Sequence, residues 1–154
     1  MSKQPQSILV VCYGNICRSP MAEALFRREL EGLGLSPAYR VASAGVGALE
    51  GLPAAPLAQE VAAAHGLLLE SHRSRRLTAE MAQGADLLIA LDEFVEDAIL
   101  RIAGDLPMES WPVDDPYGGP LEGYQRAFTD LEKHVVTCVA GLAGEDGGRA
   151  ESHT

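Results

Sequence analysis

The stretch Ser7–Pro20, SILVVCYGNICRSP, decides how this chain folds. Ser7 to Cys12 is a short run of apolar, largely β-branched residues, which is typical of a buried strand. Ser19 and Pro20 then predict the start of a helix, with Ser19 as the N-cap and Pro20 at the first helical position. The chain therefore passes from a strand to a helix through one short loop.

The rest of the chain continues this alternation. Further short strands are expected at residues 39–44, 86–91 and 109–113, and helices at residues 56–65, 78–83 and 92–102. Residues 121–142 carry one apolar stripe at helical spacing, which indicates a long final helix. Because such an order favours right-handed parallel crossovers, we expect one doubly wound α/β domain, flavodoxin-like, with a four-stranded parallel sheet and helices on both faces.

The composition narrows the class of protein. Hydrophobic residues make up 47% and charged residues 22% of the 154 residues, as in a globular domain. No apolar run is long enough to cross a bilayer and no signal peptide is evident, so we expect a cytoplasmic protein. The formal net charge of −10 argues against nucleic acid or an anionic membrane as a partner. We expect residues 1–143 to form the domain and residues 144–154 to form a disordered tail.

The loop from Cys12 to Ser19 has the residues of a phosphate-binding site. It lies at the carboxyl end of a parallel strand, where open α/β sheets bind ligands, and it enters a helix whose free N–H groups attract anions. Gly14 and Asn15 tolerate left-handed backbone angles, which let successive N–H groups curl around an anion. Arg18 offers a planar fork for two phosphate oxygens.

Cys12 would be the nucleophile of this site. The helix N-terminus and the nearby guanidinium both favour its thiolate, so it needs no neighbouring base. The hydroxyl of Ser19 could donate to the sulfur and help it leave when an intermediate breaks down. An isolated cysteine at a strand end is more often a buried core residue, but the glycine, asparagine, arginine and serine around this one favour a reactive thiolate.

The segment VVCYGNICRSPMAEALF, residues 10–26, resembles the low-molecular-weight protein tyrosine phosphatase family, whose signature is Cys-x5-Arg-Ser near the N-terminus. The resemblance extends from about residue 7 to residue 140. It implies a phosphotyrosine-containing protein as substrate, inorganic phosphate as product, and no metal or organic cofactor. We expect a monomer. The substrate- and phosphate-binding residues that the resemblance implies are Tyr13, Gly14, Asn15, Ile16, Cys17, Arg18 and Tyr117.

A second segment, Val113-Asp114-Asp115-Pro116-Tyr117-Gly118, resembles the acid loop of the same family. Asp115 matches the general acid, which would protonate the departing phenolate and later deprotonate a water molecule. Tyr117 would form a wall of the substrate cleft. Turn chemistry alone would explain this segment if the phosphate loop were absent.

The resemblance also assigns supporting residues. Ser43 and His72 would hydrogen-bond the loop asparagine and hold its strained conformation. Cys17 would form a reversible disulfide with the nucleophile. Tyr13 departs from the smaller residues that the family often carries at its position, so the substrate preference is expected to be unusual.

Several other functions remain open. Arsenate reductase chemistry on this fold needs further cysteines, and beyond the loop only Cys138 remains. Protein-arginine phosphatases tend to carry threonine where this chain has Ile16. A non-catalytic phosphoprotein-binding module would need neither the nucleophile nor the acid, and a phosphocysteine carrier would not need Arg18 and Asp115 together. The sequence therefore favours two-step hydrolysis of phosphotyrosine.

Overall fold

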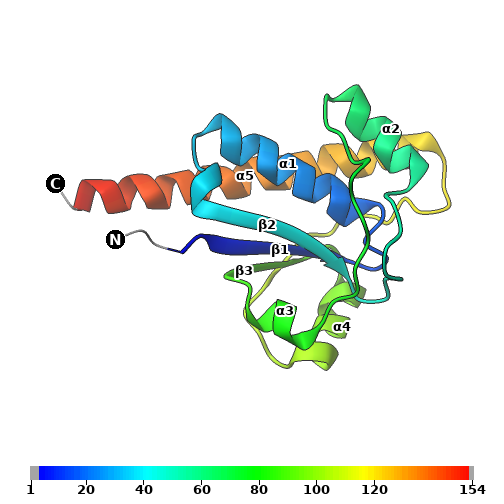
Figure 1. Ribbon diagram of the computed structural model, residues 1–154, viewed down its shortest axis with the longest axis horizontal. Helices are drawn as coiled ribbons and strands as arrows, with labels where there is room; N and C mark the ends of the chain where they lie inside the picture. The colour runs from blue at the N-terminus through cyan, green and yellow to red at the C-terminus, as the bar shows by residue number, and fades with distance from the viewer. Residues whose placement is uncertain (1–3, 153–154) are drawn as a thin grey trace.

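The structure is a computed structural model that describes residues 4–152, with side chains described up to residue 144. Strands and helices alternate along the chain (Figure 1). The strands are β1 (Gln6–Cys12), β2 (Tyr39–Gly45), β3 (Leu87–Ala90) and β4 (Glu109–Ser110). The helices are α1 (Arg18–Gly32), α2 (Pro56–Ala64), α3 (Ala79–Gln83), α4 (Glu93–Ala103) and α5 (Leu121–Ser152), with a short 3₁₀ helix at Ser36–Ala38.

The four strands form one parallel sheet in the order β2-β1-β3-β4. Strand β1 lies between β2 and β3, with Cys12 opposite Gly45 and Val11 opposite Ala90. Helices α1, α2 and α5 lie on one side of the sheet, and α3 and α4 lie on the other (Figure 1). The predicted doubly wound α/β fold with a four-stranded parallel sheet is therefore confirmed.

Each face of the sheet has its own apolar core, as the two-residue period of a strand requires. Ile8 and Val10 belong to the core beneath α1, α2 and α5, whereas Leu9 and Val11 belong to the core beneath α3 and α4. The larger core also receives the buried side of α5, which includes Phe128. Strand β1 is thus covered on both faces, and its carboxyl end is held firmly.

Two predicted bounds, the ends of β4 and α5, differ from the structure by three residues or more. Strand β4 ends at Ser110 rather than at residue 113, although Trp111 and Val113 still donate to the carbonyls of Ala90 and Leu91 at 2.8 and 3.3 Å. The Val113 N–H also donates to the Trp111 carbonyl at 2.9 Å, so the backbone turns at Pro112 and the regular ladder stops.

Helix α5 ends at Ser152 rather than at residue 142. The disordered tail expected at residues 144–154 stays a prediction. Residues 153–154 lie outside the described part of the chain. The domain boundary at residue 143 stays a prediction. Within residues 4–152, no helix is both long and apolar enough to span a membrane.

Candidate active site

A cleft of about 240 Å³ opens at the carboxyl edge of the sheet. Its floor is the loop after β1, and its walls come from the loops after β2 and β4. The predicted residues that line it are Cys12, Tyr13, Gly14, Ile16, Cys17, Arg18, Asp115 and Tyr117. Gly47, Leu49 and Leu52 also line it, and our sequence analysis did not identify them. The sequence pointed to these three residues only through their position after a predicted parallel strand.

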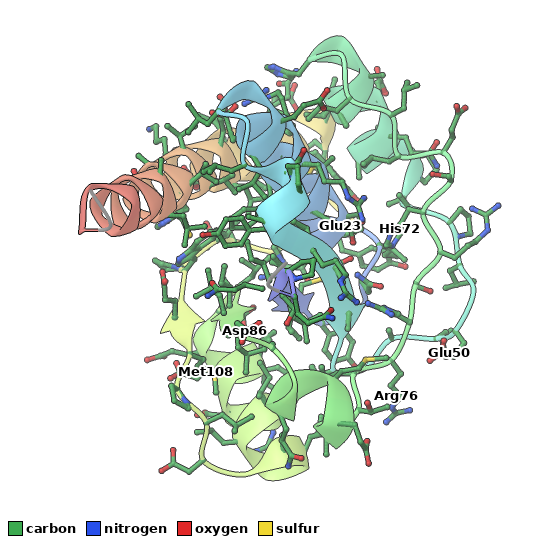
Figure 2. All side chains as sticks on the ribbon, turned by 60° about the vertical axis from the view of Figure 1, so that its left-hand side comes forward. Glu23, Glu50, His72, Arg76, Asp86 and Met108 are labelled. Atoms are coloured by element: carbon green, nitrogen blue, oxygen red, sulfur yellow. The ribbon has the colours of Figure 1, made fainter. Side chains whose placement is uncertain are left out.

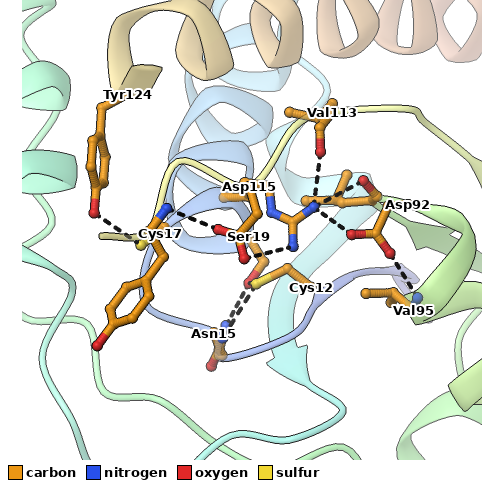
Figure 3. Close-up of polar contacts among 12 residues, drawn as sticks. Cys12, Asn15, Cys17, Ser19, Asp92, Val95, Val113, Asp115 and Tyr124 are labelled. Carbon is orange, nitrogen blue, oxygen red and sulfur yellow. Dashed lines mark hydrogen bonds and ion pairs between the residues drawn. The ribbon is translucent and has the colours of Figure 1, made fainter. Parts of the chain in front are cut away.

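The Cys12 sulfur lies at the floor of this cleft and faces two polar groups. The Asn15 N–H donates to it at 3.2 Å, and the Ser19 hydroxyl lies 2.9 Å away. Both groups stand next to the first turn of α1, whose dipole favours a negative charge. The residue is only 2% exposed, so the sulfur reaches solvent solely through the cleft. The sulfur is thus surrounded by groups that can donate hydrogen bonds to it (Figure 3).

The predicted N-cap role of Ser19 is wrong. Helix α1 begins at Arg18, so Cys17 occupies the cap position and makes no side-chain capping bond. The Ser19 hydroxyl is instead used inside the loop, where it contacts the Cys12 sulfur and accepts from Asn15 Nδ2 at 2.8 Å. The Ser19 hydroxyl cannot cap the helix and contact the Cys12 sulfur at the same time. The conformation of the loop places it against the sulfur.

Asn15 holds the loop in its curled form. Its φ of 56° lies in the left-handed region, which asparagine tolerates better than most residues. Its side chain is fully buried and donates to Ser43 Oγ at 3.0 Å while accepting the Arg75 N–H at 2.9 Å. Its carbonyl lies 2.7 Å from His72 Nε2. The contacts that the resemblance implied for Ser43 and His72 are therefore both present.

Gly14 does not use the left-handed conformation that we considered for it. Its φ is not among the positive values, and an added Cβ would make only an ordinary 3.7 Å contact with Ile16. The curl of the loop therefore depends on Asn15.

A further acidic residue supports the loop from behind. Ser43 donates its hydroxyl to Glu23 Oε1 at 2.6 Å, which leaves the Ser43 oxygen free to accept from Asn15. Arg75 Nε donates to the Ser43 carbonyl at 3.0 Å. Glu23 comes from α1 and His72 from the loop after α2 (both labelled in Figure 2), and both support Asn15, Glu23 through Ser43 and His72 directly. Sequence analysis missed Glu23, because it reads as one polar residue of an amphipathic helix.

Arg18 is almost fully buried, at 2% exposure, and its guanidinium is fixed from several sides. Nη1 donates to the carbonyls of Leu91 and Val113 at 3.2 and 2.9 Å. It also pairs with Asp92 Oδ2 at 2.8 Å, and Nη2 lies 3.6 Å from Asp115 Oδ2 (Figure 3). These contacts aim one edge of the planar group at the cleft without requiring it to move when an anion arrives.

Asp115 lines the cleft from the loop after β4. Its Oδ1 accepts the Tyr117 N–H at 3.1 Å, which forms a turn around Pro116. Its side chain is 46% exposed and lines the cleft. Tyr117, 68% exposed, stands beside it as an aromatic wall. A thiol, a guanidinium and a carboxyl group thus line one cavity.

Cys17 contacts a residue that we did not anticipate. Its sulfur lies 3.7 Å from the hydroxyl of Tyr124 on α5. Burial raises the pKa of Cys17 to about 11, and burial together with this contact raises the pKa of Tyr124 to about 12. Both groups are therefore neutral near pH 7. Tyr124 belongs to the apolar stripe of α5, so sequence analysis assigned it to the core.

No group of three or more His, Cys, Asp or Glu side chains within the described residues is arranged to hold a metal ion. The three arginines of residues 73–76, which could have supplied positive potential, do not line the cleft. Arg73 donates to the carbonyls of Glu70 and His72, and Arg75 donates to Ser43. The positive charge in the cleft therefore comes from Arg18 and the N-terminus of α1.

Comparison with known proteins agrees with this geometry. Residues 7–146 match the model of a family described as low molecular weight phosphotyrosine protein phosphatase. A probable low molecular weight protein-tyrosine-phosphatase, EpsP of Ralstonia nicotianae, is 38% identical over 84% of this chain and 91% of its own.

Two solved structures are also similar. The tyrosine phosphatase AmsI of Erwinia amylovora has a TM-score of 0.81 and 31% identity, covering 90% of this chain and 93% of its own. The YwlE arginine phosphatase, solved with a phosphorylated active-site serine, has a TM-score of 0.78 and 32% identity, covering 91% of this chain and 95% of its own. The chain therefore belongs to the low molecular weight phosphotyrosine protein phosphatase family of cysteine-dependent hydrolases.

Proposed function

We propose that this protein hydrolyses phosphotyrosine in proteins through a phosphocysteine intermediate. The observation that carries this proposal is the single cleft in which the Cys12 sulfur, the Arg18 guanidinium and the Asp115 carboxyl group all face the same space. A binding module would gain nothing from a nucleophile and an acid placed together. Hydrolysis of a phosphate ester uses both.

In the first step, the Cys12 thiolate attacks phosphorus in line as the bond from phosphorus to the phenolic oxygen breaks. Asp115, protonated at this stage, gives its proton to that oxygen, since a phenolate with a pKa of about 10 leaves more readily as the phenol. Arg18 and the loop N–H groups bind the equatorial oxygens of the phosphoryl group. Their fixed positions favour the transition state over the substrate.

In the second step, water attacks phosphorus and the bond between sulfur and phosphorus breaks. Asp115, now a carboxylate, takes the proton of the attacking water. Ser19, 2.9 Å from the sulfur, donates its hydroxyl to the thiolate that leaves. Inorganic phosphate departs, and both the nucleophile and the protonated acid are restored for another cycle.

The walls of the cleft support an aryl phosphate as the substrate. Ile16, Leu49, Leu52 and Tyr117 present apolar or aromatic surface around the entrance. A phenyl ring can pack against such walls, whereas these four side chains offer the charged guanidinium of a phosphoarginine no carboxylate. Because the YwlE arginine phosphatase has a similar structure, phosphoarginine remains the competing substrate.

One set of assays tests the proposal. We would compare the rates for an aryl phosphate and for matched phosphotyrosine, phosphoserine and phosphoarginine peptides, with and without Cys12→Ala. We expect the aryl phosphate and the phosphotyrosine peptide to be hydrolysed fastest and Cys12→Ala to abolish turnover. Faster hydrolysis of phosphoarginine would replace the proposed substrate, and activity that survives Cys12→Ala would exclude the nucleophile.

The role of Asp115 needs a separate test. We expect Asp115→Asn to slow phenyl phosphate, a poor leaving group, by about 10²- to 10⁴-fold, the usual size of general acid catalysis. It should slow esters of acidic nitrophenols much less, because their leaving groups need no proton. An equal loss for every leaving group would contradict the acid role.

A further inference from the structure

Exposed apolar side chains gather around the mouth of the cleft. In the described part of the chain, the large ones near this opening are Tyr13, Leu49, Leu52, Phe94 and Tyr117. All except Phe94 line the cleft itself. Phe94 extends the apolar surface outward, because its ring contacts that of Tyr13 with the centroids 6.0 Å apart and the planes at 56°.

The two rings do not form an ordinary core pair. Tyr13 is 50% exposed and Phe94 is 58% exposed, so each leaves a large aromatic surface in water. Their tilted contact is favourable in itself, but it leaves the outer sides of both rings without a partner. An exposed aromatic surface that continues directly into a catalytic cleft is a natural place for a substrate to dock.

Tyr13 is held in place by a glycine. A Cβ atom on Gly47 would lie 2.6–2.9 Å from three atoms of the Tyr13 ring, which is closer than any real contact. The ring therefore rests against the backbone at Gly47, whose N–H also donates to the Tyr13 carbonyl at 2.9 Å. Only the absence of a side chain at position 47 leaves room for this placement.

Phe94 is anchored just as firmly. It is the second residue of α4, and the helix start is fixed by Asp92, whose Oδ1 accepts the Val95 N–H at 2.7 Å. The other oxygen of Asp92 pairs with Arg18 at 2.8 Å. The position of Phe94 is thus tied to the phosphate site, and a substrate bound there would meet both rings in a fixed geometry.

We propose that Tyr13 and Phe94, with Gly47 beneath Tyr13, form a subsite that binds an apolar, preferably aromatic, side chain within two residues of the phosphotyrosine. This inference rests on the proposed function and adds a substrate class to it. The phosphotyrosine ring occupies the cleft between Ile16 and Tyr117, while the neighbouring side chain of the substrate packs on the outer faces of the two rings. These two rings are specificity-determining and take no part in the chemistry.

The test uses peptides of equal length and charge that carry phosphotyrosine and either Phe or Ala at each of the two residues on either side. The readout is the ratio of kcat/KM for each Phe peptide to that for its Ala counterpart. For the wild-type protein we expect a ratio of about ten at the preferred position, because an aromatic contact of this kind plus its buried area contributes at that level. No preference at any position would overturn the inference.

Two variants test whether Tyr13 and Phe94 cause the preference for the Phe peptides. Phe94→Ala removes one ring, and Gly47→Ala pushes the Tyr13 ring aside, which costs little folding free energy because only the far end of a flexible side chain must move. We expect both to lower the ratio to about two or less. Leu68→Ala, which truncates an exposed side chain outside the cleft, should keep the wild-type ratio. A ratio unchanged in Phe94→Ala would overturn the subsite.

Failure of the proposed function would be recognised separately. Turnover of free phosphotyrosine and of a simple aryl phosphate depends on the catalytic loop and not on flanking residues. If neither is hydrolysed, the proposed function is wrong, and the flanking preference is then measured as the ratio of Kd values for the same peptides with the Cys12→Ser variant. Equal Kd values for the Phe and Ala peptides would overturn the subsite in that case as well.

Discussion

The two carboxylate oxygens of Asp92 face different partners, so a pair of substitutions can separate their effects. Asp92→Asn can keep its single side-chain oxygen for the Val95 N–H, and its amide NH₂, which cannot accept from Arg18, then replaces the second oxygen, whereas Asp92→Ala loses both contacts. Both variants lose the ion pair with the buried Arg18, and we expect the alanine variant to lose about 1 kcal/mol more unfolding free energy than the asparagine variant, the usual cost of removing an N-cap. Urea unfolding measures this difference.

Asp92→Asn and Asp92→Ala should lower the catalytic activity to the same extent. Without the charged partner, Arg18 loses part of the support that aims it at the cleft, and we expect kcat/KM for an aryl phosphate to fall about tenfold in both variants. An equal loss of stability in the two variants, or full activity in Asp92→Asn, would contradict this separation of roles.

Cys17 and Tyr124 make the stability of the protein sensitive to alkali. Burial raises the pKa of Cys17 from 9.0 to about 11 and that of Tyr124 from 10.0 to about 12. The unfolded chain therefore loses these protons first as the pH rises. Their contribution is fully present below pH 9 and declines between pH 9 and about 12, by up to about 1.4 kcal/mol per pH unit for each group.

Urea unfolding at pH 8, 9 and 10 checks this dependence. We expect the free energy of unfolding to fall over this range in the wild-type protein and to fall less in Cys17→Ala. Tyr117→Phe, which removes the hydroxyl of an exposed tyrosine, should leave the slope unchanged. If the free energy of unfolding falls as steeply with pH in Cys17→Ala as in the wild-type protein, the Cys17 thiol is not the cause of the pH dependence.

At the scale of elements, the segment His72–Arg76 supports both the floor and one wall of the cleft. Its His72 ring and Arg75 N–H bond Asn15. The buried Ser74 hydroxyl donates to the Leu49 carbonyl and accepts the Leu52 N–H at 2.9 Å. On the outer side, the Arg76 N–H donates to Glu50 Oε1 at 2.8 Å, and the two residues lie close together in Figure 2.

Ser74→Ala therefore has a defined expected effect. Losing the hydroxyl frees the loop that carries Leu49 and Leu52, so we expect KM for a phosphotyrosine peptide to rise about three- to tenfold with a smaller change in kcat. Steady-state kinetics measures this split. Thr78→Ala, which deletes the N-cap hydroxyl of α3 away from the cleft, is the matched control and should lower stability alone. A purely kcat effect in Ser74→Ala would contradict this positioning role.

The elements differ in how far sequence predicts them. Strands β1, β2 and β3 fall within one residue of their expected bounds. Strands β1 and β3 carry continuous apolar runs that the two cores bury on both faces, whereas β2 is an edge strand whose run is interrupted by Arg40 and Ser43. Ser19 could not be assigned correctly, since its hydroxyl suits either a helix cap or the Cys12 sulfur and only the loop geometry decides. Glu23 and Tyr124 act through residues distant in the chain, so no local pattern identifies them.

For the molecule as a whole, the fold brings together residues from each strand end. Cys12 ends β1, Gly47 and Leu49 follow β2, Asp92 follows β3 and Asp115 follows β4. The family resemblance predicts the nucleophile and the acid, because both lie in short motifs. The wall after β2 has no such motif, and its residues become identifiable only when the parallel strands are aligned at one edge.

Shortening helix α5 tests where the folded domain ends. The side of α5 that faces the larger core is buried from Tyr124 to Val139, with Leu142 half-buried beyond it. A chain ending at residue 143 keeps these contacts, so we expect its Tm to stay within about 3 °C of that of the full chain. A chain ending at residue 134 loses the burial of Val135 and Val139, each worth roughly 1.5–3 kcal/mol, and we expect its Tm to fall by about 10 °C or more. Thermal unfolding followed by circular dichroism measures both, and a large loss on ending at residue 143 would mean that the domain extends further along α5.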